Sequence, residues 1–184
     1  STLLRTAAFA LLAGSVQAGN FPAPGQGITV SFTGAADDFV IPTTNPPLSV
    51  RLLVKGASGG NALTDWCEST GGRGAVMEAD FEVGTGPGDL EPGGTIRFLI
   101  GEAGKDGQSS QAAGGGGGGS GVLYQAPSSS VWVPLLVAGG GGGASQSQDF
   151  GQCLWSRDGI DASLSTCGTR SGNDEYLDVT QQIG

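Results

Sequence analysis

Apolar and polar residues alternate in short stretches along most of the chain, and Gly or Pro separates one stretch from the next. The cleanest alternation lies in residues 48–55, which place four apolar side chains on one face: Leu48, Val50, Leu52 and Val54. Beyond residue 20, no long stretch has a helical period. The pattern predicts an all-β fold, a two-sheet sandwich with jelly-roll-like topology. Its strand candidates are residues 27–33, 38–41, 48–55, 74–83, 95–101, 122–124, 131–138 and 175–179.

Three acidic residues share one face of the strand predicted at residues 74–83: Glu78, Asp80 and Glu82. Paired carboxylates can act as general acid and base, but the solvent-facing side chains of a half-buried strand have the same spacing of two residues. We interpret this face as a solvated surface.

The first 20 residues form an apolar arm whose hydrophobic pattern differs from that of the rest of the chain. One arginine, an apolar run over residues 7–16 and the sequence Val16-Gln17-Ala18 are typical of a secretory signal with its cleavage site. A signal that is removed is the alternative interpretation, but we expect the segment to be retained. The predicted organisation is an arm over residues 1–20 and one glycine-rich β-sandwich domain over residues 21–184.

The arm is too short to be membrane-spanning, because about 20 apolar residues are needed to cross a bilayer. We therefore expect it to be buried against protein, either on its own domain or inside a neighbouring copy, as an added strand or as a helix. We favour insertion into a neighbour. The residues expected to make this contact are Leu3, Leu4, Phe9, Leu11, Leu12 and Val16.

Glycine accounts for 36 of the 184 residues, and two pure glycine runs at residues 114–119 and 139–143 flank the apolar segment 131–138. A flexible linker is the ordinary interpretation of such runs. However, the apolar segment between them must be buried, so the ends of both runs are held in place. We expect the runs to pack side by side as left-handed polyglycine helices joined by main-chain hydrogen bonds.

Five sequence blocks occur in an order seen in a known family: "DFVIPTTNPPLSVRLLVKGASGG", "GGRGAVMEADFEV", "PGDLEPGGTIRFLIGEAGKDG", "GGGGGGSGVLY" and "PLLVAGGGGGA". They resemble the glycine-rich domains of bacteriophage tail-fibre and bacterial surface proteins, and are similar to the glycine-rich region of the anaplastic lymphoma kinase receptor. The resemblance covers residues 38–145. It implies a β-sandwich that carries packed polyglycine helices, in extracellular or virion-surface proteins used for adhesion, ligand binding or fibre building.

The composition argues against several classes of function. The formal net charge is -9 and the basic residues are scattered, so no nucleic-acid surface is expected. Histidine is absent, which removes the commonest general base and metal ligand. We expect no enzyme and no catalytic, cofactor-binding or metal site. Asp158 and Asp161 lack the ligand spacing of an EF-hand calcium loop, so we interpret them as parts of a solvated turn.

The three cysteines have no metal-binding spacing, so one disulfide is expected. Cys153 and Cys167 close a short loop and are the preferred pair, with a bond from Cys67 to either of them as the alternative. Trp132 is expected in the core. The other two tryptophans adjoin cysteines and are expected to shield the disulfide, with stacking on sugar rings as the alternative role: Trp66 and Trp155.

These features together predict the structural protomer of an extracellular fibre. Copies of the chain would join head to tail, each inserting its arm into the next. The alternative is an adhesin or ligand-binding module of the phage-fibre or receptor type, with surface glycans or a cell-surface receptor as the partner. Both interpretations place the protein outside the cell, as a secreted, cell-surface or virion-surface protein.

Overall fold

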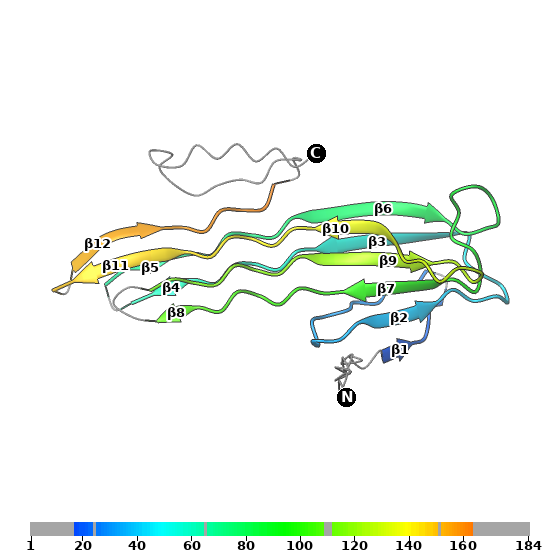
Figure 1. The fold of residues 1–184 in the computed structure, drawn as a ribbon, viewed down its shortest axis with the longest axis horizontal. Helices are drawn as coiled ribbons and strands as arrows, with labels where there is room; N and C mark the ends of the chain where they lie inside the picture. Colours follow the sequence, from blue (N-terminus) through cyan, green and yellow to red (C-terminus); the bar gives the residue numbers. More distant parts are fainter. Residues whose placement is uncertain (1–16, 24, 65, 109–111, 151, 164–184) are drawn as a thin grey trace, which may run out of the picture.

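A computed structural model describes residues 17–23, 25–64, 66–108, 112–150 and 152–163. These residues contain strands but no helix, which confirms the all-β prediction. The molecule is elongated, with strands at both ends and wavy segments running between them (Figure 1). We call the end that holds β3 and β6 the core end, and the end that holds β11 and β12 the distal end. Within the described residues, no helix is long and apolar enough to cross a membrane.

A five-stranded sheet forms one layer of the core end. Its order is β1-β2-β7-β9-β10, with β1 parallel to β2 and the other neighbours antiparallel. The strands are β1 (Gln17–Gly19), β2 (Asp37–Val40), β7 (Thr95–Leu99), β9 (Ser120–Gln125) and β10 (Val133–Ala138). Residues assigned to the arm from sequence thus supply β1, the outermost strand of this sheet.

The second layer of the core end is a pair of antiparallel strands, β3 (Ser49–Lys55) and β6 (Val76–Glu82). Both strands contact β10, and β3 also contacts β9. Side chains from both layers form the main core: Ile41, Leu52, Val54, Ala75, Leu90, Ile96, Val122, Tyr124, Leu136 and Ala138. Alternation explains this packing, because every second residue of a strand faces the same side.

Most strands predicted from alternation are present, within a few residues of the expected bounds. In β3 the alternation is confirmed, although Leu48 precedes the strand and is exposed. The prediction of a strand over residues 27–33 is wrong, because this segment forms no ladder. Alternation shows that a segment can form half of a ladder, but a strand also requires a partner edge. The candidate at residues 175–179 lies outside the described residues.

Six segments, which we call the glycine bundle, run between the two ends (Figure 1). Backbone hydrogen bonds join them, and the partner segment recurs every three residues. For example, the Gly56 and Gly59 N–H groups donate to Ala75 and Gly72, both at 2.9 Å. The runs are therefore held by neighbouring main chain, and the flexible-linker alternative does not apply. The bundle comprises residues 56–61, 70–75, 101–107, 112–119, 139–144 and 158–162.

Close approach of backbones explains why the bundle needs glycine. A Cβ atom at Gly117 would overlap the carbonyl oxygen of Ala57 in another segment, where no side chain can move aside. The next position differs, because a Cβ at Gly116 would lie 3.7 Å from its nearest neighbour, the Gly141 oxygen. A Cβ atom would therefore overlap neighbouring backbone at some positions of the bundle and make only an ordinary contact at others.

The distal end is built from strands that the alternation did not predict, and three of them have only 2 residues each. A three-stranded sheet has the order β5-β4-β8, and β11 pairs with β12 in a hairpin. A small cluster of Ala62, Ala112 and Ala144 is buried here. The strands are β4 (Ala62–Leu63), β5 (Glu68–Ser69), β8 (Gly107–Gln108), β11 (Ser145–Asp149) and β12 (Gln152–Arg157).

The buried phenol of Tyr124 predicts a loss of stability at alkaline pH. Burial raises the pKa of Tyr124, partly opposed by the hydrogen bond that Glu91 N–H donates to its oxygen at 2.8 Å. The folded pKa exceeds the unfolded value of about 10, so the stabilisation is complete below a pH of about 10 and is lost as the pH rises through the folded pKa. We expect the urea midpoint to fall more steeply above pH of about 10 in the parent chain than in Tyr124→Phe. Equal slopes would contradict this expectation.

Candidate functional site

An apolar groove of about 1300 Å³ opens at the core end beside β3, and we call it the β3 groove. One wall is β3 with its flanking residues, and the opposite wall is formed by residues 21–23 and 25–32. The five-stranded sheet supplies the floor through Phe39, Ile96 and Phe98. The groove continues toward the glycine bundle along Ile100, Gly101 and Ala103. It lies where the second layer has no further strand beside β3.

Strand β3 has one edge bonded to β6 and one edge without partners. At the two ends of the ladder, Val83 N–H donates to Leu48 and Gly56 N–H donates to Ala75, each at 2.9 Å. Antiparallel residues direct their backbone groups alternately to opposite sides. The even-numbered residues of β3 therefore bond to β6, and the odd-numbered ones point away. Within the described residues, the backbone N–H and C=O groups of four odd-numbered residues of β3 make no backbone hydrogen bond: Ser49, Arg51, Leu53 and Lys55.

The opposite wall of the groove also presents unpaired backbone. No backbone hydrogen bond involves residues 27–32 among the residues that the structure describes. This is the segment whose alternation predicts a strand, and Ile28 and Phe32 remain partly exposed. Unpaired strand edges readily accept another strand. The β3 groove is thus bounded on two sides by main chain that can bind an added segment.

The floor of the groove is apolar and includes a packed pair of aromatic rings. Phe39 and Phe98 meet edge to face, with ring centroids 5.5 Å apart, a favourable arrangement for aromatic rings. Ile96 lies between the two layers and is almost completely buried. A segment that enters the groove would therefore meet apolar side chains below and hydrogen-bonding backbone beside it.

An ion pair lies at the rim of the groove. The Arg51 guanidinium donates to both carboxylate oxygens of Asp80, at 2.7 and 3.0 Å, and approaches Glu78 at 3.5 Å. The hydrogen bond from Arg51 lowers the pKa of Asp80, and desolvation opposes this only in part. These side chains are solvent-exposed, which confirms the interpretation of the acidic face as a solvated surface.

A second ion pair lies on the five-stranded sheet. Arg97 donates two hydrogen bonds to Asp38, both at 2.7 Å, across the β2–β7 ladder. The hydrogen bond to Asp38 raises the pKa of Arg97. The guanidinium carbon also lies 4.1 Å from the centroid of the Trp132 ring, a cation–π contact. Trp132 is half-buried beneath this cation, so the prediction that it belongs to the core is wrong.

Carboxylates attach the last described segment to the bundle. Asp158 accepts hydrogen bonds from the Thr70 N–H at 2.7 Å and from the Thr70 hydroxyl at 3.1 Å. Asp161 accepts from Arg73 N–H at 2.6 Å. Both aspartates are exposed, which confirms that their side chains are solvated, and both also cap neighbouring backbone, a role that the sequence did not indicate. The described residues contain no cluster of three or more side chains suited to a metal ion.

The structure joins Cys67 to Cys153, with Cα atoms 5.3 Å apart, so the preferred pairing of Cys153 with Cys167 is wrong. Sequence separation misled the prediction, because β12 contacts β5 across the distal end and thereby brings Cys153 beside Cys67. The predicted partner Cys167 lies outside the described residues.

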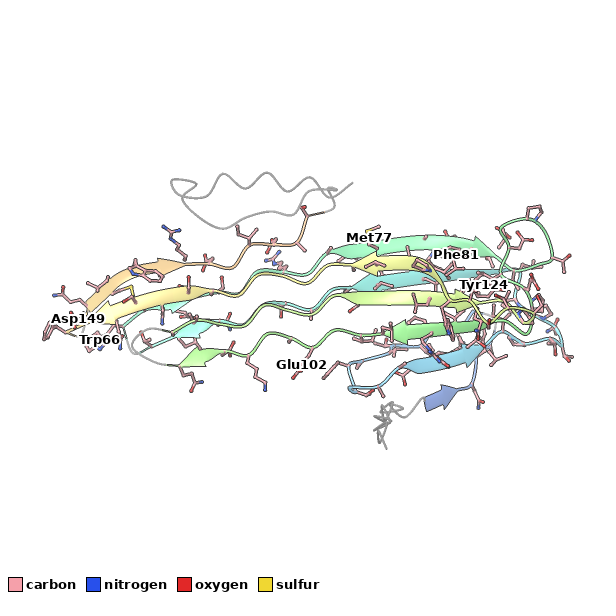
Figure 2. All side chains as sticks on the ribbon, viewed as in Figure 1. Trp66, Met77, Phe81, Glu102, Tyr124 and Asp149 are labelled. Carbon is pink, nitrogen blue, oxygen red and sulfur yellow. A yellow bond between two sulfur atoms is a disulfide. The ribbon has the colours of Figure 1, made fainter. Side chains whose placement is uncertain are left out.

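The distal end exposes aromatic side chains near this disulfide, and Figure 2 shows Trp66 at the opposite end of the molecule from Tyr124. Trp66 is 63% exposed and Trp155 is 48% exposed, so both keep a large solvent-exposed surface beside the disulfide cysteines. Phe150 is 97% exposed in the hairpin loop between β11 and β12, with a positive φ of 47°. These three residues form what we call the aromatic tip.

The residues predicted to make the assembly contact, Leu3, Leu4, Phe9, Leu11, Leu12 and Val16, lie outside the described residues. The structure does place the point from which the arm leaves, since Gln17 pairs with Asp37 at the outer edge of the five-stranded sheet. Sequence reasoning missed the β3 groove. Its only signal was the strand pattern of residues 27–33.

The fold and site define an all-β protein with an open sheet edge and a main-chain bundle. In the comparisons with known proteins, no family model, curated protein or solved structure matches the chain. The functional assignment therefore rests on the geometry of the groove.

Proposed function

We propose that the chain is the structural protomer of an extracellular homopolymeric fibre, in which the arm of one copy inserts into the β3 groove of the next. The observation that carries the proposal is the groove itself, because an apolar floor and two rows of unpaired backbone form a receptor for a peptide segment. We assign no enzymatic role, cofactor or nucleic-acid partner to the protein.

The arm supplies the apolar side chains that an occupant of the groove requires. It contributes several large apolar side chains within 16 residues before β1. Their burial would contribute on the order of 10 kcal/mol before ordering costs, at about 25 cal/mol per Å². The arm leaves from the edge of one sheet, whereas the groove lies beside a strand of the other sheet. Contact between different surfaces of identical copies produces an open, head-to-tail polymer.

We also propose a finer architecture for the protomer. The two layers of the core end would form a jelly-roll-like β-sandwich that is one strand short beside β3. The glycine bundle would consist of polyglycine helices, a proposal supported by the three-residue period of its hydrogen bonds, since left-handed extended helices have three residues per turn. Such a bundle would act as a stiff spacer between the joint and the aromatic tip.

The disulfide and the signal-like arm support an extracellular location. Disulfides persist in oxidising compartments, and the Cys67–Cys153 bond closes a separation of 86 residues. A fibre outside the cell also fits the low charge content of the chain, with 14% charged residues and two glycine runs.

Deleting residues 1–16 should abolish polymers without unfolding the domain, because β1 and the described sheets are retained. We expect the full chain to form filaments in negative-stain electron microscopy, and the deleted chain to elute as a monomer in size-exclusion chromatography with light scattering. A matched control replaces Thr2 and Thr6 with serine, which keeps the apolar residues and should keep the filaments. Filaments from the deleted chain, or discrete particles from both chains, would contradict the proposal.

The aromatic tip favours a second candidate, an adhesin or ligand-binding module. Exposed Trp66, Phe150 and Trp155 can stack on sugar rings or pack against a receptor. Binding at the tip would not require residues 1–16, since the groove is at the other end of the molecule. The same deletion therefore separates the two candidates.

A further inference from the structure

We infer that the arm enters the groove as a β-strand, bonded to the free edge of β3 in the next copy, with Phe9 and Leu11 facing the groove floor. The inference rests on the proposed function, because it assumes that arms join copies. It adds the conformation of the arm, the strand to which it binds and the side chains that face inward.

Hydrogen bonding favours a strand over a helix. The odd-numbered residues of β3 direct N–H and C=O groups into the groove, where no described residue accepts or donates. A helix satisfies its own backbone and would cover these groups without bonding to them, which is costly in a water-excluded site. An added strand bonds to the edge along its whole length. The unpaired wall at residues 27–32 can bond to its other edge.

The length of the arm fits this arrangement. Strand β3 has 7 residues, and residues 1–16 before β1 are more than enough to pair along its whole length. If residues 6–12 pair with β3, the even-numbered arm residues lie opposite the odd-numbered residues of β3, and residues 13–16 remain as the link to β1. At about 3.3 Å per residue, this link spans only roughly 13–17 Å, so successive copies would lie close together.

Side-chain alternation sets which face of the arm points inward. In a strand, Phe9 and Leu11 share a face with Ala7 and Ala13, whereas the other face carries Ala8, Ala10 and Leu12. The groove floor is apolar and aromatic, so it suits the face that carries the phenylalanine. The second face would then lie beside the outer side chains of β3.

The exposure of Leu53 agrees with this orientation. Leu53 lies on the outer face of β3 and is 50% exposed, between the charged residues Arg51 and Lys55. A neighbouring strand that presents Ala10 or Leu12 would cover it. The same strand would also cover the mouth of the groove, where Ile28 and Phe32 are partly exposed.

Cysteine cross-linking tests the inference directly. In a Cys167→Ser background, chains carrying Leu53→Cys are mixed with chains carrying one arm cysteine at position 8, 9, 10, 11 or 12, and then oxidised. Because disulfides need Cα atoms about 4.4–6.8 Å apart, we expect intermolecular dimers to be most abundant from whichever of positions 8, 10 and 12 lies opposite Leu53, and at least tenfold fewer from positions 9 and 11. Val137→Cys is the matched acceptor control, since Val137 is 63% exposed and lies outside the groove.

A proline at the same acceptor position supplies a second test. Leu53→Pro removes an N–H from the free edge but none from the β3–β6 ladder, whereas Leu53→Ala removes only the side chain. We expect Leu53→Pro to raise the critical concentration for filaments about tenfold above that of Leu53→Ala, as loss of one hydrogen bond predicts. Thermal melting of both arm-deleted variants checks that the domain still folds.

Several results would overturn the inference. A cross-linking period of three or four residues would indicate a helix, and cross-links confined to single chains would place the arm in its own groove. Filaments without any cross-link to Leu53→Cys would place the acceptor elsewhere and leave the fibre proposal standing. Absence of filaments from the unmodified chain would refute the fibre proposal itself.

Discussion

Replacing Gly117 with alanine should lower the free energy of unfolding by about 3 kcal/mol, the upper part of the usual range for overpacking. The added methyl group would overlap the carbonyl oxygen of Ala57, and relief requires one backbone segment to move away from another. Movement of either segment would weaken hydrogen bonds on several sides, since Ala57 N–H donates to Gly118 at 3.0 Å and Gly141 N–H donates to Ala57 at 2.9 Å. The midpoint of thermal unfolding should fall by roughly 6–12 °C.

The matched control is Gly116→Ala, one residue away in the same run. Its methyl group would lie 3.7 Å from the nearest atom, an ordinary contact. Alanine restricts the unfolded chain more than glycine does, so this variant should be as stable as the parent or more stable by about 0.5 kcal/mol. Differential scanning calorimetry of the three chains measures the contrast. Equal destabilisation at both positions would show that the run does not pack against Ala57 as described.

Breaking the Cys67–Cys153 bond should destabilise the protein by about 4–5 kcal/mol. The bond joins residues 86 apart, and closing a loop of that length raises the free energy of the unfolded state by roughly this much, because it removes chain entropy. Because Cys153 is exposed, Cys153→Ala removes the bond with little loss of packing. The double variant Cys153→Ala/Cys167→Ala is compared with the single variant Cys167→Ala. Both lack the thiol at position 167, so it cannot form a new disulfide.

Chemical denaturation and peptide mapping check this prediction together. The Cys167→Ala variant should unfold like the parent chain, and a non-reducing digest should contain one peptide pair linked through Cys67 and Cys153. A linked pair that contains Cys167 in the parent chain would contradict the pairing. A double variant as stable as the single variant would show that the distal end folds without the bond.

The strands of the core end could be predicted from sequence because the alternation that indicates each strand lies within the strand itself. Alternation in residues 48–55 indicates both the strand and the side that faces the core, and Leu52 and Val54 are indeed buried. The residues of a segment do not show which other strand it pairs with. Residues 27–33 also alternate, yet they remain unpaired beside a free edge, so the groove was not predictable from pattern alone.

The distal end and the disulfide could not be predicted from sequence, because both depend on contacts between segments that are far apart in the chain. Strands β4, β5 and β8 have only 2 residues each, too few for any periodic signal. Cys153 was paired with Cys167 because the intervening loop is short, whereas the folded chain brings Cys67 closer. Asp158 and Asp161 cap backbone from residues 70–73, a role that depends on the folded neighbourhood and leaves no local motif.

The composition of the glycine bundle affects how the protein responds to temperature. Apolar surface exposed on unfolding raises the heat capacity change, whereas exposed polar surface lowers it. Beyond the small cluster of Ala62, Ala112 and Ala144, the bundle is held by main-chain hydrogen bonds. Its unfolding therefore has a small heat capacity change per residue, and its stability varies little on cooling. We therefore expect the bundle to keep its stability at low temperature, where a structure held by hydrophobic packing would weaken.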